Sequence, residues 1–582
     1  MFPRVCIAMA ILLGLTPLAQ GQAKKNKPNV IVIMTDDQGH GDLGCHGNPV
    51  IKTPNLDKLA KKSVRMKNFY VSPVCSPTRA SLLTGRYNYR TGVVDTFVGR
   101  SMMHSDEITL AELLRTLGYR TGIFGKWHLG DNYPLRAMDQ GFTESLVLKG
   151  GGIGQPSDPP GGESYFNPIL QHNGKAVKKD GYCSDVFTEA AINFIGKNKD
   201  SPFFCYLAFN CPHGPLQVPK KYHDIYKDKI KLSDFPKIGF PLEGKVPLDE
   251  TEKIYGMITN IDDNIGRLLA KLDELGIADD TIVIFLTDNG PQQLRYNSGM
   301  RGRKASLFEG GTRVPFFVCW PAGFKGDRDI DRIAAHIDIT PTLVHACGGL
   351  MPKDRTIDGR NLLPLWQDLK ADWPDRSLFF QWHRGDVPEM YRACAVRDQR
   401  WRLVQPNGIV EKTKFDKAKW LLFDVEKDPY ETKDLAGETP DVVVSLKKRY
   451  ELWFKDVEST RQFKPPLIVI GSDKENPTIL TRQDWRSKDG NWTPKSLGHW
   501  DLRVEKSGEF EFTATMATAA AKGGVVNLRV GTRKFSSVID QDTKAATFRN
   551  IDLPAGPAQL EAWVVEGETN RGMRYVEVRR IK

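Results

Sequence analysis

The sequence is poor in cysteine for its length and has no long hydrophobic run beyond its first residues. Nine cysteines among 582 residues are too few and too scattered for a disulfide-stapled scaffold. After residue 19, no stretch reaches the roughly 20 apolar residues that a membrane-spanning helix needs. Zinc-finger spacing, a helix-turn-helix and a basic stripe interleaved with aromatic residues are also missing, which argues against nucleic acid as a partner. These absences indicate a globular protein with no membrane anchor.

Residues 1–23 have the composition of a secretory signal. Arg4 gives a short basic start, residues 5–19 form an apolar run too short to span a bilayer, and small residues follow. Cys6 lies too early in this run to be a lipid-anchoring cysteine. We therefore expect an exported protein, periplasmic or secreted. The single glycosylation sequon, Asn491-Trp492-Thr493, favours a bacterial source, and a eukaryotic protein of this kind would be lysosomal or extracellular.

The rest of the composition is that of a large globular protein with an excess of basic residues. Apolar residues make up 40% and charged residues 26%, and the length predicts roughly two or three domains. The formal net charge of +11 favours polyanionic partners. Sulfated polymers suit an exported protein better than nucleic acid does, although a solvated basic surface explains the charge equally well.

Three continuous apolar runs predict strands that are buried on both faces. They are residues 28–34, 202–209 and 281–286, and helical patterns such as 110–117 and 254–275 lie between them. This alternation predicts an α/β fold in which a doubly wound, mostly parallel sheet carries helices on both faces. In such folds, ligands bind beyond the carboxyl ends of the strands.

Polar residues follow each of these strands. Asp36 and Asp37 come after the first, His213 after the second, and Asp288 and Asn289 after the third. The carboxyl ends of parallel strands meet at one edge of a sheet, so we expect these side chains to lie together. Carboxylate and amide oxygens suit calcium or magnesium rather than zinc, and calcium tolerates an irregular set of oxygens better. We therefore expect one calcium ion, with magnesium as the weaker alternative and turns capped by side chains as the explanation without a metal.

A lone cysteine precedes a predicted helix start in the segment C-S-P-T-R-A-S-L-L-T-G-R. Ser76 suits the N-cap, Pro77 suits the first helical position, and Gly85 can end the helix. Cys75 is therefore expected at the positive end of a helix, with Arg79 about one turn further in. A thiolate nucleophile would fit this position. However, the Cys-to-Arg spacing is too short for a phosphatase-type loop, and no second cysteine lies nearby for redox exchange.

This segment resembles the signature of the formylglycine-dependent type I sulfatases, the arylsulfatase family of the alkaline phosphatase superfamily. In that family a maturation enzyme oxidises the cysteine of C-x-P-x-R to an aldehyde. The resemblance runs through roughly residues 29–435 and includes G-K-W-H-L-G, P-H-G-P, E-G-G-T-R and L-F-D with D-P. It implies metal ligation by Asp36, Asp37, Asp288, Asn289 and the modified Cys75. It also implies catalytic roles for Arg79, Lys126, His128, His213 and Lys304.

The resemblance implies a sulfatase that hydrolyses sulfate monoesters, with a sulfated carbohydrate as the expected substrate. A hydrated formylglycine at position 75, bound to the metal, would attack sulfur while Asp288 takes its proton, giving a covalent sulfoenzyme. With His128 as the base, loss of the second hydroxyl proton would then collapse the hemiacetal and expel sulfate. The other implied roles are sulfate binding by Lys126 and Lys304, diol binding by Arg79, and protonation of the leaving oxygen by His213.

The remainder of the chain predicts two further units. After a catalytic α/β domain at 24–365, residues 366–465 resemble the small antiparallel β subdomain of sulfatases, and 466–582 alternate like a β-sandwich. His383 and Arg384 of the subdomain are expected to bind the non-sulfated part of the substrate, unless they belong to an exposed loop. Four tryptophans either stack on sugars or fill the sandwich core: Trp485, Trp492, Trp500 and Trp563.

Two other functions remain open at this point. A formylglycine-dependent phosphonate or phosphate monoester hydrolase shares the fold and the requirements for metal and charge. A non-catalytic glycan-binding protein would need none of the acidic, histidine and lysine residues, and their complete presence argues against it.

Overall fold

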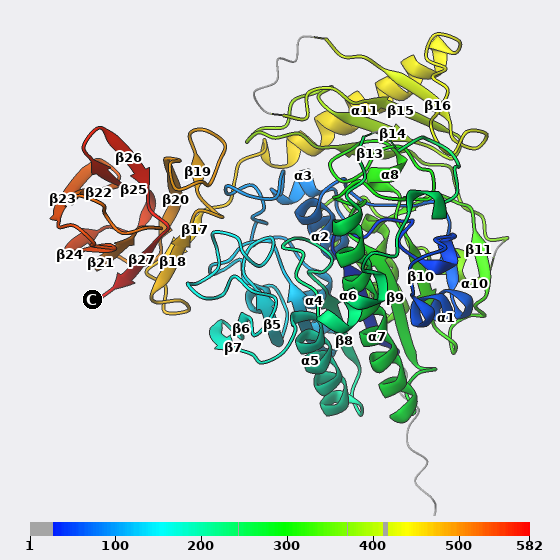
Figure 1. Cartoon of the computed structure of the whole chain (residues 1–582), viewed down its shortest axis with the longest axis horizontal. Coiled ribbons are helices and arrows are strands. Elements are labelled where there is room, and N and C mark those ends of the chain that lie inside the picture. The colour runs from blue at the N-terminus through cyan, green and yellow to red at the C-terminus, as the bar shows by residue number, and fades with distance from the viewer. Residues whose placement is uncertain (1–26, 243, 369, 411–416) are drawn as a thin grey trace, which may run out of the picture.

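The computed structural model describes residues 27–242, 244–368, 370–410 and 417–582. The predicted signal, residues 1–23, lies outside the described residues and stays a prediction. Within the described ranges, no helix is both long and apolar enough to cross a membrane. The chain forms a large α/β body and a smaller all-β body beside it, which contains the C-terminus (Figure 1).

A ten-stranded sheet runs through the described part of the large body, in the order β11-β2-β10-β9-β1-β8-β4-β5-β6-β7. Its centre is parallel and consists of β9 (Thr281–Thr287), β1 (Asn29–Thr35), β8 (Phe203–Ala208), β4 (Arg120–Lys126) and β5 (Glu144–Leu148). The three predicted apolar runs are thus neighbouring strands, and the predicted fold class is confirmed.

The outer strands of this sheet reverse direction on both sides. Next to β9, β10 (Phe316–Cys319) is antiparallel and pairs in turn with β2 (Val64–Met66). On the far edge, β6 (Ile169–His172) and β7 (Lys175–Lys178) form an antiparallel extension of β5. The remaining edge strand is β11 (Arg328–Ile330), and a separate two-stranded sheet joins β3 (Phe69–Tyr70) to β12 (Ala334–Ala335).

Helices cover both faces of the sheet because alternate residues of each central strand point to opposite sides. Val30, Val32 and Met34 of β1 pack in one core, while Ile31 and Ile33 pack in the other. The first core contains α2 (Cys75–Thr84), α4 (Leu110–Thr116), α9 (Ile339–Ala346) and α10 (Leu363–Gln367). The second contains α1 (Pro54–Lys62), α5 (Cys183–Asn198) and α7 (Leu248–Glu274), and α6 (Lys220–Tyr226) lies against α7.

The helix that carries Cys75 begins earlier than the sequence predicts. It starts at Cys75 itself, with Val74 in the N-cap position. The prediction that Ser76 caps the helix is wrong, because Ser76 lies in the first turn and its hydroxyl has no partner among the described residues. Gly85 ends the helix as predicted, with φ 72° and its N–H donating to the Ser81 carbonyl. Cys75 therefore lies within the first turn rather than before it.

A small antiparallel sheet packs beside the main one, as the resemblance implied. Its order is β13-β14-β15-β16, and α11 (Pro440–Arg461) covers it with a shared core. The strands are β13 (Leu378–Gln381), β14 (Cys394–Arg397), β15 (Trp401–Gln405) and β16 (Leu421–Asp424). The short helix α3 (Asn88–Thr91) contacts α2 and α11, and Glu309 of α8 (Glu309–Thr312) pairs with Arg402 of β15. The predicted boundary at 366 stays a prediction.

Residues 468–580, all described, form two further sheets that share one core. One contains β17 (Ile468–Ile470), β19 (Arg486–Ser487), β20 (Gly498–Val504), β22 (Gly524–Val530), β23 (Arg533–Ile539), β25 (Gly556–Glu566) and β26 (Thr569–Gly572). The other contains β18 (Thr478–Thr481), β21 (Gly508–Thr515), β24 (Ala545–Leu553) and β27 (Tyr575–Arg580). Trp485 and Trp500 are fully buried in this core, which excludes them from sugar binding.

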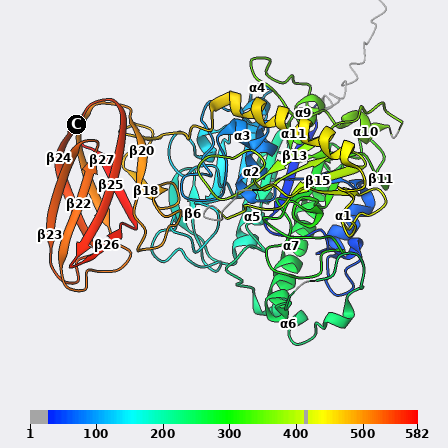
Figure 2. The same ribbon diagram turned by 90° about the horizontal axis from the view of Figure 1, so that it is seen from above.

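The sandwich is docked on the large body rather than tethered to it (Figure 2). Val98, Met102 and Leu135 of the large body belong to the core of the sandwich. The docking also includes backbone pairing, since the Gly99 N–H donates to the Gln483 carbonyl at 2.8 Å. Segments that are far apart in the sequence therefore share one core and a backbone hydrogen bond.

Candidate active site

The predicted metal ligands, including Cys75, converge at the carboxyl edge of the main sheet. Asp36 and Asp37 follow β1, Asp288 and Asn289 follow β9, and Cys75 begins α2. Ligand atoms of Asp36, Cys75 and Asp288 all lie within 4.8 Å of one another, and all three residues are buried. The convergence follows from the parallel pairing of β1 with β9, which brings their ends to the same edge.

Asp36 is paired with Lys126, the last residue of β4. The Lys126 Nζ atom lies 2.6 Å from Asp36 Oδ2, and both side chains are fully buried. Because β8 separates β1 from β4 in the sheet, only a long side chain such as lysine bridges the two strand ends. The ion pair keeps a positive charge directly beside the predicted metal site.

Asp288 is held by Arg79 from the next turn of α2. Arg79 donates to Asp288 Oδ2 from Nε at 3.2 Å and from a terminal nitrogen at 2.8 Å. Its other terminal nitrogen donates to the Lys126 carbonyl at 3.0 Å, so this one buried side chain joins α2, β9 and β4. Thr78 adds a hydrogen bond from its hydroxyl to the Asp288 carbonyl, at 2.7 Å.

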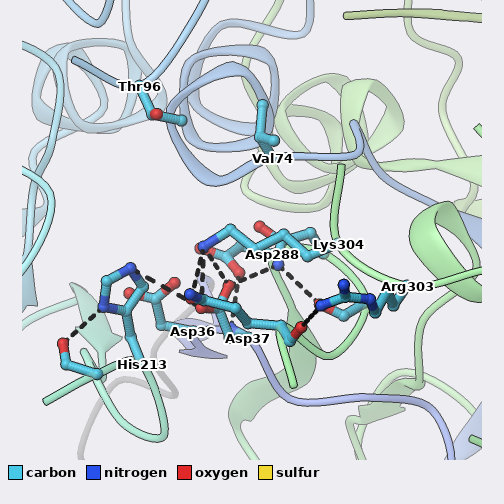
Figure 3. A network of polar contacts seen from close by, with 12 residues as sticks. Asp36, Asp37, Val74, Thr96, His213, Asp288, Arg303 and Lys304 are labelled. Carbon is cyan, nitrogen blue, oxygen red and sulfur yellow. Dashed lines mark hydrogen bonds and ion pairs between the residues drawn. The ribbon is translucent and has the colours of Figure 1, made fainter. Parts of the chain in front are cut away.

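Asp37 lies close to three more of the predicted residues: Lys304, Asn289 and His213 (Figure 3). Lys304 Nζ lies 2.7 Å from Asp37 Oδ1, and the Asn289 amide donates to the same oxygen at 2.8 Å. His213 Nε2 lies 3.8 Å from the other carboxylate oxygen. Burial alone would raise the pKa of Asp37, but the charge of Lys304, joined by that of His213 when its ring is protonated at low pH, holds this pKa below its usual range. Asp37 is therefore ionised at neutral pH.

Asp288 has the opposite shift. Burial and the neighbouring Asp36 carboxylate raise the pKa of Asp288 to about 7, although Arg79 and Lys126 lower it. Burial also raises the pKa of the Cys75 thiol, which is protonated at neutral pH as a result. An unmodified Cys75 is therefore a poor nucleophile here, in spite of its place at a helix N-terminus.

The two histidines have defined tautomers because each contacts a carbonyl, which only accepts hydrogen bonds. His128 donates from Nε2 to the Thr96 carbonyl at 2.6 Å, which leaves its buried Nδ1 free of partners among the described residues. His213 donates from Nδ1 to the Gly214 carbonyl at 2.8 Å, which leaves Nε2 facing Asp37. Burial and Lys304 lower the pKa of His213 to about 4, and burial and Lys126 lower the pKa of His128. Both rings are thus neutral.

The donor atoms fit a hard divalent cation. Asp36 Oδ1 and Asn289 Oδ1 are buried oxygens with no hydrogen-bond partner in the part of the chain that the structure describes. Such orphaned oxygens carry a desolvation cost that a cation would remove. Carboxylates and an amide carbonyl are oxygen ligands of the kind that calcium and magnesium take, and the mutual repulsion of Asp36 and Asp288 favours a cation between them.

A cavity of about 900 Å³ opens above these residues. The predicted residues Cys75, His128, His213, Lys304 and Arg384 line it. Sequence reasoning missed its other basic residues, Arg301 and Arg303, although both lie in the basic run R-G-R-K that includes Lys304.

His383 does not reach this cavity. The residue is only 3% exposed, and both ring nitrogens contact backbone groups: Nδ1 lies 2.8 Å from the Arg384 carbonyl, and Nε2 accepts from the Glu389 N–H at 3.0 Å. The structure thus separates two adjacent residues that were predicted to act together. His383 shapes the turn, while the neighbouring Arg384 faces the cavity.

Comparison with known proteins agrees with this geometry. The sequence matches the family model described as Sulfatase over residues 28–349, and the one described as N-sulphoglucosamine sulphohydrolase, C-terminal, over residues 303–455. Human arylsulfatase A (Homo sapiens) is 30% identical over 511 residues, covering 79% of this chain and 94% of the relative. N-acetylgalactosamine-6-sulfatase of Homo sapiens is 32% identical over 392 residues, covering 62% of this chain and 69% of the relative.

A solved structure is similar as well. Ps i-CgsB, in complex with k-i-k-neocarrahexaose, has a TM-score of 0.63 and 27% identity, covering 76% of this chain and 94% of that chain. Both family models end before the sandwich, and the first alone spans more than half of the chain. The chain therefore belongs to the sulfatase family, whose members are sulfuric ester hydrolases.

Proposed function

We propose that this sulfatase removes sulfate from a sulfated carbohydrate and that its nucleophile is a formylglycine made from Cys75. The observation that carries the proposal is the buried cluster of Asp36, Cys75 and Asp288 at the floor of a basic cavity. The raised pKa of the Cys75 thiol supports the modification, because the unmodified side chain is not an anion at neutral pH. The segment C-S-P-T-R supplies the residues that a formylglycine-generating maturation enzyme reads in this family.

Asp36, Asp37, Asp288, Asn289 and position 75 would hold the cation, which we take to be calcium. A bound divalent cation lowers the pKa of a coordinated hydroxyl and so supplies a nucleophile at neutral pH. Asp288 then has two tasks, as a ligand and as the acceptor of that proton. Arg79 fixes its carboxylate with two hydrogen bonds, so the orientation of Asp288 does not depend on the substrate.

His128 is suited to act as a base after sulfate transfer. Its Nε2 hydrogen is committed to the Thr96 carbonyl, so Nδ1 is the nitrogen with a free lone pair. The lowered pKa keeps the ring neutral and able to accept a proton. Removal of the second hydroxyl proton by His128 releases sulfate without attack of water on sulfur.

Lys126 and Lys304 are the groups that bind the sulfate oxygens. Both ammonium groups already touch the cluster, at Asp36 and at Asp37, and they are in place before charge develops in the transition state. His213 has its Nε2 atom between Asp37 and the cavity, where the leaving oxygen must be protonated. Its ring is neutral in the free protein, and the arrival of an anionic sulfate ester raises its pKa and so favours the protonated acid.

The carbohydrate part of the proposal rests on the cavity and on the relatives. The cavity is far larger than a sulfate group and combines arginines with aromatic rings, which suits an anionic sugar. One relative is named for N-acetylgalactosamine 6-sulfate, and Ps i-CgsB was solved with a hexasaccharide. Both support a sulfated saccharide as the substrate class.

Two measurements test the proposal together. The mass of the proteolytic peptide that contains Cys75 should be that of formylglycine in protein made with a maturation enzyme. This protein should release sulfate from sulfated saccharides, lose the activity in EDTA, and regain more of it with calcium than with magnesium. Faster turnover of phosphonate or phosphate monoesters than of any sulfate ester would overturn the assignment, as would full activity with an unmodified thiol.

A further inference from the structure

One wall of the active-site cavity comes from the C-terminal sandwich. Asn491 and Trp492, on the loop between β19 and β20, line the same cavity as Cys75. The two family models end at residues 349 and 455, so this wall lies outside the segments that the family matches cover. Trp492 is half-buried and Asn491 is exposed, unlike Trp485 and Trp500 of the sandwich core.

The loop that carries Trp492 is held in shape by its own hydrogen bonds. The Asp489 carboxylate accepts from the Asn491 N–H at 3.2 Å and from the Ser496 hydroxyl at 3.0 Å. The Thr493 and Ser496 hydroxyls lie 2.9 Å apart, and the Lys488 N–H donates to the Leu497 carbonyl at 2.9 Å. A loop held by its own hydrogen bonds loses little entropy when it binds a ligand.

Trp492 belongs to a stack of side chains from all three units of the protein. Its ring lies edge-on to Phe97 of the large body, with centroids 4.9 Å apart. Arg384 of the small-sheet unit lies over the Phe97 ring, with its guanidinium carbon 4.5 Å from the ring centroid. All three residues line the cavity.

Arg384 is held in this stack by a hydrogen bond, but part of its guanidinium group still faces the cavity. One of its terminal nitrogens donates to Asp95 Oδ1 at 2.7 Å, and Trp382 donates to the same oxygen from Nε1 at 2.9 Å. The Arg384 side chain is still 35% exposed, so its guanidinium offers donors to the cavity. The stack thus presents an aromatic surface with one cation at its border.

We propose that Trp492, Phe97 and Arg384 form a subsite for the saccharide unit next to the sulfated one. The inference rests on the proposed function, since it assumes that the cluster around Cys75 takes the sulfate. An aromatic ring suits the apolar face of a sugar, an arginine suits a sulfate or carboxylate on it, and the Asn491 amide suits its hydroxyl groups. The occupant is therefore an anionic oligosaccharide that extends from the sulfate site to the sandwich.

The geometry makes the subsite dependent on the docking of the sandwich. The Gln483 amide donates to the Thr96 carbonyl at 3.1 Å and to the Ser101 hydroxyl at 3.2 Å, so the sandwich fixes the loop that carries Phe97. The same Thr96 carbonyl accepts from His128. The loop that carries Phe97 therefore contacts both the proposed subsite and the catalytic base His128.

The test compares long and short substrates. Trp492→Ala should lower kcat/KM at least tenfold for a sulfated hexasaccharide, and less than threefold for the sulfated monosaccharide of the same unit and for 4-nitrophenyl sulfate. Trp492→Phe keeps a ring and should recover most of the loss. Trp563→Ala is the matched control, because Trp563 is a half-buried tryptophan of the same module that does not line the cavity.

A binding measurement tests the subsite independently of turnover. In a Cys75→Ala background, calorimetry should give a hexasaccharide Kd at least tenfold higher when Trp492→Ala is added, with Trp563→Ala having no such effect. Equal losses for long and short substrates, or an unchanged hexasaccharide Kd, would overturn the subsite. Failure of the modified wild type to release sulfate from any ester would instead overturn the proposed function, and the calorimetry would still judge the subsite.

Discussion

Two of the groups of buried carboxylates among the described residues differ in the cations beside them. Around Cys75, Asp36, Asp37 and Asp288 each contact a lysine or an arginine. At the junction with the sandwich, Asp131 and Asp484 are also buried, but their carboxylates accept hydrogen bonds from backbone N–H groups: Gly150 donates to Asp131, and the Asp131 N–H donates to Asp484.

The difference appears in the pKa values. Burial and the nearby Asp131 raise the pKa of Asp484 to about 8, and burial raises that of Asp131, although Lys149 attracts both from a distance. In the catalytic cluster, Lys304 holds the pKa of Asp37 low, while burial and the neighbouring Asp36 raise that of Asp288. At the junction, Asp484 therefore holds a proton at neutral pH, whereas the catalytic cluster is arranged to hold a cation.

The largest expected effect is the loss of the nucleophile. Cys75→Ala removes the precursor of formylglycine and should lower turnover at least ~10⁴-fold, because no other group in the cluster can form the covalent intermediate. Thermal unfolding should change little, since the side chain is small. Cys394→Ala, a buried cysteine of the small sheet, is the control and should keep its activity. More than a few per cent of wild-type turnover in Cys75→Ala would contradict the mechanism.

The second prediction removes a cation from the catalytic cluster, so that a buried carboxylate there lacks a charged partner, as at the junction. Lys126→Met leaves Asp36 buried without its cation and should destabilise the large body by about 3–5 kcal/mol, the usual cost of breaking a buried pair. Activity should be lost as well. Denaturant unfolding measures the stability, and adding Asp36→Asn should restore part of it. Lys149→Met is the matched control, with an expected change below about 1 kcal/mol because its charge acts only from a distance. Equal effects of the two lysines would remove the distinction between the regions.

Much of the catalytic cluster was predictable because the fold itself gathers it. Strands buried on both faces have a strong sequence pattern, and parallel pairing then brings Asp36 and Asp288 to one edge regardless of their separation in the sequence. The start of α2 was misplaced because Ser76 and Pro77 suit a helix start by local preference, while the structure begins the helix at Cys75.

The residues that were misjudged or left undecided depend on contacts that no local pattern encodes. His383 and Arg384 are adjacent in the sequence, yet backbone hydrogen bonds turn one inward and leave the other facing the cavity. Alternation in the sandwich could not separate Trp492 from Trp500, because the role of Trp492 depends on how the sandwich docks against Phe97. The first difference depends on backbone contacts within a turn and the second on the domain junction, and both geometries arise only in the folded chain.

The smallest expected effect concerns the junction alone. Since the folded-state pKa of Asp484 is raised above its unfolded value, folding takes up a proton, and this contribution to stability is present at low pH and lost as pH rises towards about 8. Asp484→Asn should therefore raise the melting temperature at pH 8.5 and change it much less at pH 5.5. The expected gain exceeds about 1 kcal/mol at the higher pH, because one pKa unit corresponds to about 1.4 kcal/mol.

The control for this prediction is Asp473→Asn, on the exposed surface of the sandwich, where lysine and arginine already pair with the carboxylate. It should alter the melting temperature equally little at both pH values. The measurement is calorimetric unfolding of the wild type, Asp484→Asn and Asp473→Asn between pH 5.5 and pH 8.5. A stabilisation by Asp484→Asn that is the same at both pH values would mean that the junction carboxylates do not share a proton. The contrast between the two regions would then reflect packing rather than charge.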